Sequence, residues 1–194
     1  MARISKTNEH ALEKKPLADG VALVTGGSRG IGLAIAQQLA ILGASISICG
    51  RDRTALEGSA RALAKLGVPV HGQIADVTNP VEIADLVAKT EAALGPITIL
   101  VNNAGIGLFG PAHEKSEADW DRVLDTNLKS VFLVSRAVAP SMIRRGSGDI
   151  INISSLAGKN TFAGGGIYCA SKWVFSVFPA AWRKIFANTA FASA

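Results

Sequence analysis

Short apolar runs alternate with longer amphipathic stretches along the chain. The runs at 21–24, 46–49, 68–70, 97–101 and 149–153 have the length and composition of buried strands. Between them, apolar residues recur every three or four positions at 31–42, 53–66, 80–94 and 120–138, which predicts helices. Strands that alternate with helices predict an α/β fold, a three-layer doubly wound parallel sheet of five strands with helices on both faces.

The residue patterns of two predicted helices lead to more specific predictions. In the first, Ile31, Ile35, Leu39 and Leu42 share one apolar face. The long helix near the middle carries one stripe of mostly apolar side chains, and Asn127 lies on that stripe. A buried amide needs hydrogen-bond partners, so Asn127 is either a structural bridge or part of a site.

The two ends of the chain differ from its centre. Residues 1–16 are polar and predict a flexible N-terminal tail, and 17–178 predict one domain. Pro179 falls where the last helix would continue, and a proline there removes a hydrogen bond and clashes with the preceding turn. Residues 179–194 are therefore interpreted as an atypical C-terminal tail.

Composition and charge remove several classes of function. The 194 residues are 48% hydrophobic and carry a net charge of +5, but the basic residues are scattered, so nucleic-acid binding is not expected. No apolar run reaches membrane-spanning length and no signal peptide is apparent, which predicts a cytoplasmic protein without a membrane partner. Cys49 and Cys169 lie far apart and predict free thiols with no metal site.

Four glycines follow the first strand, at Gly26, Gly27, Gly30 and Gly32. Glycines between a strand and a helix let the backbone approach a pyrophosphate, which the N-terminus of the helix attracts. The alternative is a glycine-rich turn without a ligand.

Two other motifs carry less weight. Gly26-x-Ser28-x-Gly30 matches a hydrolase nucleophile elbow. A hydrolase would also need an acid and then a histidine downstream, where only His71 and His113 are available, and an earlier strand to supply an oxyanion hole. A second glycine motif begins at Gly105, but Pro111 prevents a helix from opening on it.

Tyr168 and Lys172 are four residues apart in a predicted helix, and Ser155 precedes the tyrosine by thirteen positions. Helical spacing places the phenol and the ammonium on one face. A neighbouring cation favours the phenolate and lowers the pKa of a tyrosine toward the range useful for acid–base catalysis.

Together these motifs resemble the classical branch of the short-chain dehydrogenase/reductase family, which has a Rossmann-like fold. The resemblance rests on TGGSRGIG after the first strand, Asp76, NNAG after the fourth strand, Asn127, Ser155 and Tyr168-x3-Lys172, and spans about residues 17 to 173. Within the family, the chain resembles the 3-oxoacyl-carrier-protein reductases and related carbonyl reductases. The sixth and seventh strands of the family are not recognisable, so the chain is interpreted as truncated or frame-shifted after about residue 173.

The resemblance implies hydride transfer between a small-molecule carbonyl and an alcohol, with a nicotinamide cofactor. It implies Tyr168 as the proton donor, Ser155 as hydrogen-bond donor to the carbonyl oxygen, Lys172 on the cofactor ribose, and Asn127 at a water relay. It also implies a homodimer or homotetramer. The implied cofactor-binding residues are Gly26, Ser28, Arg29, Gly30, Ile31, Gly32, Arg51, Asp76, Val77, Asn102, Ala104, Gly105, Tyr168 and Lys172.

The choice of cofactor is predicted from the end of the second strand. Relatives that bind NAD place a carboxylate there, whereas this chain has Gly50 followed by Arg51. Arg29 and Arg51 would attract the 2′-phosphate, so NADP(H) is predicted over NAD(H). Asp52 comes too late for the ribose and is expected to cap the next helix.

The alternative function is a catalytically inactive, nucleotide-binding remnant of the family.

Overall fold

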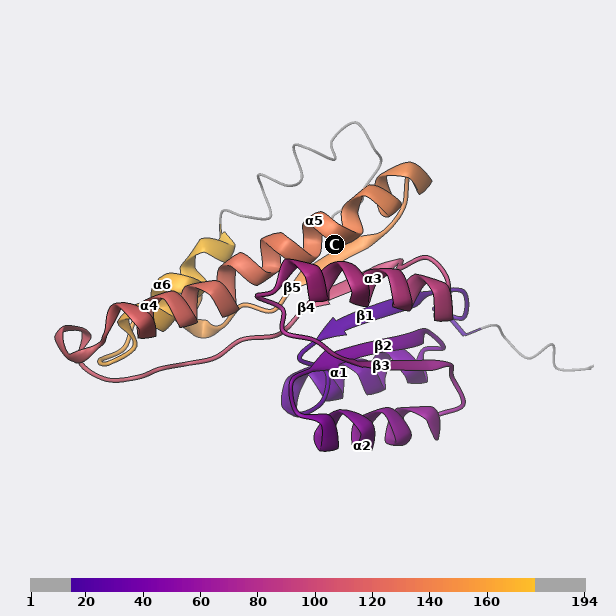
Figure 1. The fold of residues 1–194 in the computed structure, drawn as a ribbon, viewed down its shortest axis with the longest axis horizontal. Helices are drawn as coiled ribbons and strands as arrows, with labels where there is room; N and C mark the ends of the chain where they lie inside the picture. The colour runs from indigo at the N-terminus through magenta and orange to yellow at the C-terminus, as the bar shows by residue number, and fades with distance from the viewer. Residues whose placement is uncertain (1–14, 177–194) are drawn as a thin grey trace, which may run out of the picture.

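Five parallel strands form one sheet in the order β3-β2-β1-β4-β5 (Figure 1). The computed structural model describes residues 15–176, so the predicted C-terminal tail and all but two residues of the N-terminal tail lie outside the described residues. The strands are β1 (Val21–Thr25), β2 (Ser45–Gly50), β3 (Val70–Ile74), β4 (Ile99–Asn102) and β5 (Asp149–Asn152). The predicted α/β parallel sheet of five strands is confirmed.

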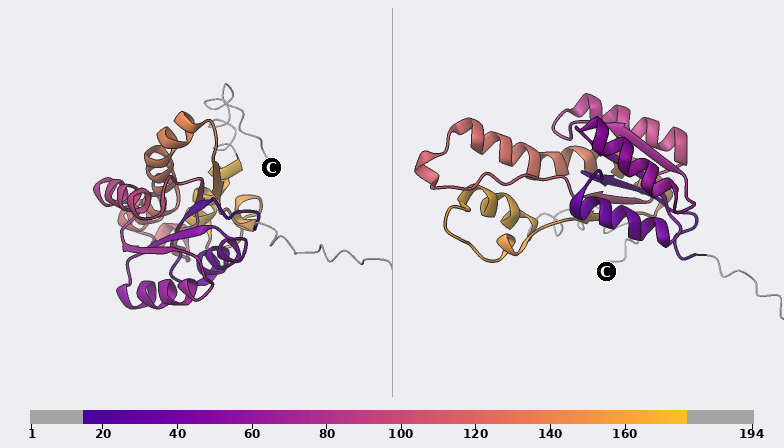
Figure 2. Two further views of the ribbon diagram at one scale, coloured as in Figure 1. Left: turned by 90° about the vertical axis from the view of Figure 1, so that its right-hand side faces the viewer. Right: turned by 90° about the horizontal axis from the view of Figure 1, so that it is seen from below.

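Helices cover both faces of the sheet (Figures 1 and 2). The helices are α1 (Gly30–Ile41), α2 (Arg53–Ala64), α3 (Pro80–Leu94), α4 (Glu117–Leu124), α5 (Ser130–Arg145) and α6 (Gly166–Trp173). Because side chains alternate along a strand, Val21 and Leu23 of β1 pack with α3 and α5, whereas Ala22 and Val24 pack with α1 and α2. In Figure 1, α4 and α6 extend past the carboxyl ends of the strands.

The fully buried positions of helix α1 are small residues, and its large apolar residues are at most partly buried. Its buried positions are Gly32, Ala36 and Ala40. Of the predicted apolar face, Ile35 and Leu39 are partly buried against the core, whereas Ile31 is 66% exposed and Leu42 is 41% exposed, so the prediction is only half correct. Periodicity failed in part because small side chains, which carry little hydrophobic signal, allow the helix backbone to approach β1 closely.

The predicted long helix is two helices joined by a π-helical turn, η2 (Asp125–Lys129). Asn127 lies in this turn and is almost fully buried. A π-helical turn accommodates one extra residue inside an α-helix and often lies at a functional site. The hydrogen bonds that the Asn127 side chain makes explain why a polar residue is buried in this turn.

The start of α2 follows the sequence-based prediction. The Asp52 side chain accepts a hydrogen bond from the backbone N–H of Ala55 at 3.0 Å and caps the helix.

None of the helices between residues 15 and 176 is long and apolar enough to span a membrane.

Candidate active site

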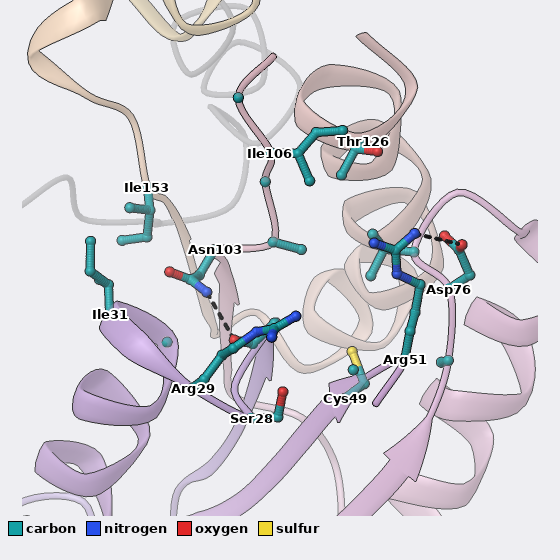
Figure 3. Close-up of a pocket in the computed structure, with 18 of the residues that line it drawn as sticks. Ser28, Arg29, Ile31, Cys49, Arg51, Asp76, Asn103, Ile106, Thr126 and Ile153 are labelled. Carbon is teal, nitrogen blue, oxygen red and sulfur yellow. Dashed lines mark hydrogen bonds and ion pairs between the residues drawn. The ribbon is translucent and has the colours of Figure 1, made fainter. Parts of the chain in front are cut away.

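A cavity of about 420 Å³ lies past the carboxyl ends of the strands (Figure 3). Parallel α/β sheets bind their ligands at this edge. The cavity is bordered by the turn between β1 and α1, the segments after β2, β3, β4 and β5, the π-helical turn η2 and helix α6. Of the predicted site residues, those that line it are Gly26, Ser28, Arg29, Ile31, Gly32, Arg51, Asp76, Val77, Ala104, Gly105, Tyr168 and Lys172.

Asn102 and Asn103 differ in where their side chains lie. Asn102, predicted to line the cofactor groove, is buried and donates hydrogen bonds to Ser135 Oγ at 3.0 Å and Asn152 Oδ1 at 2.9 Å. Asn103, which was not predicted, lines the cavity instead. The alternation along β4 could have indicated this, because Leu100 and Asn102 share the face that packs on α5.

Asn103 also fixes the glycine turn. Its Nδ2 donates to the carbonyl oxygens of Thr25 at 2.9 Å and Gly26 at 3.3 Å. A Cβ atom on Gly32 would lie 2.4 Å from that Nδ2 and 2.5 Å from the Gly26 oxygen, so only glycine fits at this position. Gly26 adopts a φ of 63°, a conformation that also favours glycine.

The N-terminus of α1 faces this cavity without a capping side chain. Arg29 is its N-cap residue and makes no side-chain cap hydrogen bond, and the first turn holds no acidic residue. A Cβ on Gly30 would meet nothing within 4 Å, so the space beside the turn is open. Unpaired N–H groups at a helix N-terminus attract anions. These features fit the pyrophosphate of a dinucleotide.

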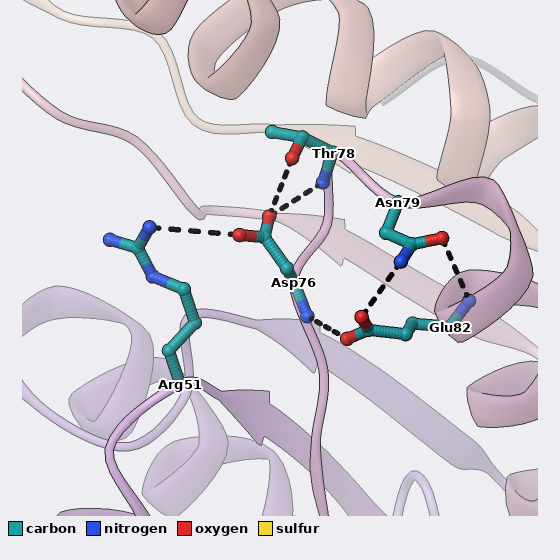
Figure 4. A network of polar contacts seen from close by, with 5 residues as sticks. All are labelled: Arg51, Asp76, Thr78, Asn79 and Glu82. Carbon is teal, nitrogen blue, oxygen red and sulfur yellow. Dashed lines mark hydrogen bonds and ion pairs between the residues drawn. The ribbon is translucent and has the colours of Figure 1, made fainter.

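Arg51 and Asp76 form an ion pair at the other end of the cavity, with Arg51 Nη1 3.7 Å from Asp76 Oδ2 (Figures 3 and 4). The backbone N–H and the hydroxyl of Thr78 both donate to Asp76 Oδ1, at 2.9 and 2.8 Å. Partial burial acts to raise the pKa of Asp76, but the Thr78 hydrogen bonds and the Arg51 charge together lower that pKa below its ordinary value. The sequence did not predict this pairing.

Glu82 supports the backbone of the same corner (Figure 4). Its Oε2 accepts from the backbone N–H of Asp76 at 2.8 Å, and its Oε1 accepts from Asn79 Nδ2 at 2.8 Å. Asn79 in turn caps α3 by accepting from the N–H groups of Val81 and Glu82. The segment after β3 is therefore anchored to the start of α3.

Cys49 adds a thiol to the cavity wall that the sequence-based site did not include. It is fully buried, and burial raises the pKa of its thiol to about 11. The thiol is therefore neutral at physiological pH.

Tyr168 and Lys172 border the cavity from α6. Lys172 Nζ donates to the carbonyl oxygen of Ile153 at 2.8 Å, and burial lowers the pKa of its ammonium. The Tyr168 ring is half-buried and meets Phe109 edge to face, with ring centroids 5.5 Å apart. The predicted pair thus shares one cavity with the predicted phosphate turn.

Ser155 lies outside the set of lining residues. It begins the short 3₁₀ helix η3 (Leu156–Gly158), and its Oγ accepts from the N–H of Ala157 at 3.1 Å. The neighbouring Ser154 does line the cavity, and its hydroxyl donates to the carbonyl oxygen of Lys172 at 3.3 Å.

Asn127 joins three parts of the site. Its Oδ1 accepts from the N–H of Ile106 at 2.7 Å, and its Nδ2 donates to the Ile106 oxygen at 2.8 Å and to Ser171 Oγ at 2.9 Å. Ser171 donates onward to the carbonyl oxygen of Tyr168 at 2.7 Å. A Cβ on Gly105 would lie 3.2 Å from Asn127 Oδ1 and 3.7 Å from Lys172 Nζ, so these groups converge.

Comparison with known proteins identifies relatives along most of the chain. The sequence profile described as short chain dehydrogenase matches residues 20–190. Gluconate 5-dehydrogenase from Gluconobacter oxydans (strain 621H) is 42% identical over 156 residues, which are 80% of this chain and 61% of that protein. Dehydrogenase/reductase SDR family member 4 from Oryctolagus cuniculus is 39% identical, covering 82% of this chain and 62% of that protein. The chain thus spans about three-fifths of the length of these relatives.

Solved structures are similar to this chain in both fold and sequence. A metagenomic short-chain oxidoreductase in complex with NADP superposes with a TM-score of 0.84 at 41% identity, covering 89% of this chain and 79% of that one. NAD⁺-bound xylitol dehydrogenase gives a TM-score of 0.87 at 32% identity, covering 90% of this chain and 68% of that one. The profile match, these relatives and the shared arrangement of strands show that the chain belongs to the short-chain dehydrogenase family.

Proposed function

We propose that the protein interconverts a carbonyl and an alcohol of a small-molecule substrate by hydride transfer, with NADP(H) as cofactor. The observation that carries the proposal is that Tyr168 and Lys172 line the same cavity as the uncapped N-terminus of α1. The nicotinamide, when bound, supplies or accepts the hydride. The relatives named above as dehydrogenases and reductases support this class of reaction.

Tyr168 is the proposed acid and base. Its hydroxyl gives a proton to the carbonyl oxygen during reduction and takes it back during oxidation. The Lys172 ammonium, one helical turn along α6, favours the phenolate of Tyr168 and is positioned to bind the cofactor ribose. Ser155 Oγ accepts from Ala157, which leaves its own proton for the substrate oxygen on which charge develops.

Asn127 is proposed to hold the site together. Both of its N–H groups are used by Ile106 and Ser171, so a water of the predicted proton relay could only donate to its Oδ1. Its hydrogen bonds join the loop after β4 to the helix that carries Tyr168 and Lys172.

The preference for NADP(H) is supported by the charges at the adenosine end. The Arg29 and Arg51 guanidinium groups both extend over the cavity (Figure 3). Asp76 is already engaged by Thr78 and Arg51. A Cβ on Gly50 would lie 2.8 Å from Ser28 Oγ, so a carboxylate at that position, as in NAD-binding relatives, would require Ser28 to move. Both nicotinamide cofactors occur among the similar structures, so the preference rests on these residues.

The activity is tested with purified protein, NADPH and a panel of ketones and 3-oxoacyl thioesters. We expect substrate-dependent NADPH oxidation, and we expect Tyr168→Phe to reduce the turnover rate about 100-fold to 10,000-fold while leaving the dissociation constant for NADPH within about threefold. NADPH binding without turnover by the unmodified chain would favour the alternative of a nucleotide-binding remnant. Absence of NADPH binding would refute both proposals.

The cofactor preference is tested by comparing dissociation constants for NADPH and NADH. Arg51→Asp should weaken NADPH binding about tenfold to 100-fold, because a charge-assisted contact is lost and a second carboxylate is placed beside Asp76. Arg53→Asp is the matched control, because it makes the same change in charge at a residue that does not line this cavity. Equal effects of the two substitutions, or an unmodified protein that prefers NADH, would contradict the assignment.

A further inference from the structure

Lys172 has an aromatic neighbour beneath its charge. Its Nζ lies 5.2 Å from the centroid of the Phe175 ring. Lys172 is 5% exposed and Phe175 is 8% exposed, so the contact is shielded from water. A cation over an aromatic ring within about 6 Å is attracted by the electrons of the ring face, most strongly where water is excluded.

The local backbone explains why these two side chains meet. Lys172 belongs to the last turn of α6, and Phe175 follows in the 3₁₀ helix η4 (Val174–Ser176). In a 3₁₀ turn, residues three positions apart lie almost directly above one another. The tightening of the helix after Trp173 therefore stacks residue 175 on residue 172, while the α-helical turn before it carries Tyr168.

The ring is needed because Lys172 has little other compensation for its burial. Its described polar contact is the single carbonyl oxygen of Ile153, and no carboxylate of residues 15–176 forms an ion pair with it. A buried ammonium is unfavourable unless partner groups stabilise its charge. Burial lowers the pKa of the Lys172 ammonium, and a ring that stabilises the charge acts in the opposite direction.

Other charged groups are near enough to be considered. Tyr168 is the titratable group one turn away, and Arg29, Arg51 and Asp76 line the same cavity. The charged residues of the elements packed against α6 are Glu117, Asp119, Asp121, Arg122, Asp125, Lys129 and Lys159. Besides the Ile153 carbonyl oxygen, Phe175 is the group that the structure places against the ammonium.

We propose that Phe175 is a positioning residue for Lys172: its ring face holds the buried ammonium at the wall of the cavity and favours its charged form. The consequence for catalysis rests on the function proposed above, but the contact itself does not. A residue that only fills space would act through its volume, whereas a cation–π partner acts through the electron density of its ring.

The experiment changes the ring electronics at nearly constant shape. Phe175 is replaced site-specifically by mono-, di- and trifluorinated phenylalanine, and the pKa of Lys172 is measured by NMR of lysine side chains, with Lys172→Arg identifying the signal. We expect the pKa to fall stepwise with each added fluorine, and Phe175→Leu to lower it by about 0.5 to 1. The same fluorinated residues at the half-exposed Phe132, which faces Arg136, are the matched control and should leave the Lys172 pKa unchanged.

The dissociation constant for NADPH is the second measurement. It should rise along the same fluorinated series, about threefold to tenfold for Phe175→Leu, because a less charged and less fixed Lys172 binds the ribose hydroxyls more weakly. A Lys172 pKa that is the same across the fluorinated series would overturn the proposal. If the pKa shifts as expected but the unmodified protein does not bind NADPH, the proposed function fails while the assignment of Phe175 stands.

Discussion

Asp76 shows how one carboxylate can be held by its neighbours and still line the cavity. Thr78 occupies its Oδ1 with two hydrogen bonds, which turns Oδ2 toward Arg51 and the cavity. Glu82 fixes the backbone of Asp76 at the same time. Because the aspartate is held in place before a ligand arrives, less conformational entropy is lost when a nucleotide binds.

The lowered pKa of Asp76 makes a prediction for the acid stability of the protein. A group whose pKa is lower in the folded state stabilises the fold above its unfolded pKa, about 3.9, and that stabilisation is lost as the pH falls through the folded pKa. The difference in unfolding free energy between the unmodified protein and Asp76→Asn should therefore be constant between about pH 6 and 8 and shrink below about pH 4.

Urea unfolding at a series of pH values measures this difference. Thr78→Val, which removes one of the two Thr78 donors, should reduce the pH-dependent part without removing it. A difference between the unmodified protein and Asp76→Asn that stays constant down to about pH 2 would show that Asp76 has its ordinary pKa.

At the scale of elements, the sequence predicted the features that depend on a strong contrast between hydrophobic and polar positions. The strands β1, β2 and β4 could be identified because buried parallel strands are short, continuous apolar runs. The outer strands β3 and β5 contain polar residues and none of their residues is buried, so their signal is weaker. The packing face of α1 could not, because Gly32, Ala36 and Ala40 bury backbone rather than large side chains. The π-helical turn at Asn127 also left no signal, since it depends on hydrogen bonds to Ile106 and Ser171, distant in sequence.

A similar difference separates the site residues that the sequence predicted from those that it missed. Tyr168 and Lys172 were located because helical spacing relates them directly. Cys49 and Phe175 were missed because their positions depend on how separate segments meet in space. The one-residue difference between Asn102 and Asn103 was predictable in principle from the alternation of β4, which could have been extended to the end of the strand.

At the scale of the whole molecule, the shape of the cavity depends on how closely the helices and loops pack against the sheet. It is lined by residues from seven separate segments, from Gly26 after β1 to Lys172 in α6. Helix α1 approaches its neighbours closely at Gly32, which lies against Asn103 and Gly26. Any increase in the distance between α1 and the sheet would separate the glycine turn from the loop after β4.

A single added methyl group should therefore act on the whole site. Gly32→Ala places a Cβ 2.4 Å from Asn103 Nδ2 and 2.5 Å from the Gly26 carbonyl oxygen, and we expect it to destabilise the fold by about 1 to 3 kcal/mol and to weaken NADPH binding at least tenfold. Gly58→Ala is the matched control, because its Cβ meets nothing within 4 Å in the interior of α2. That change should stabilise the protein by about 0.5 to 1 kcal/mol and leave NADPH binding unchanged. Urea unfolding and NADPH titration of both variants measure these effects. If Gly32→Ala were as stable and bound NADPH as tightly as the unmodified protein, the close packing of α1 could not be what shapes the cavity.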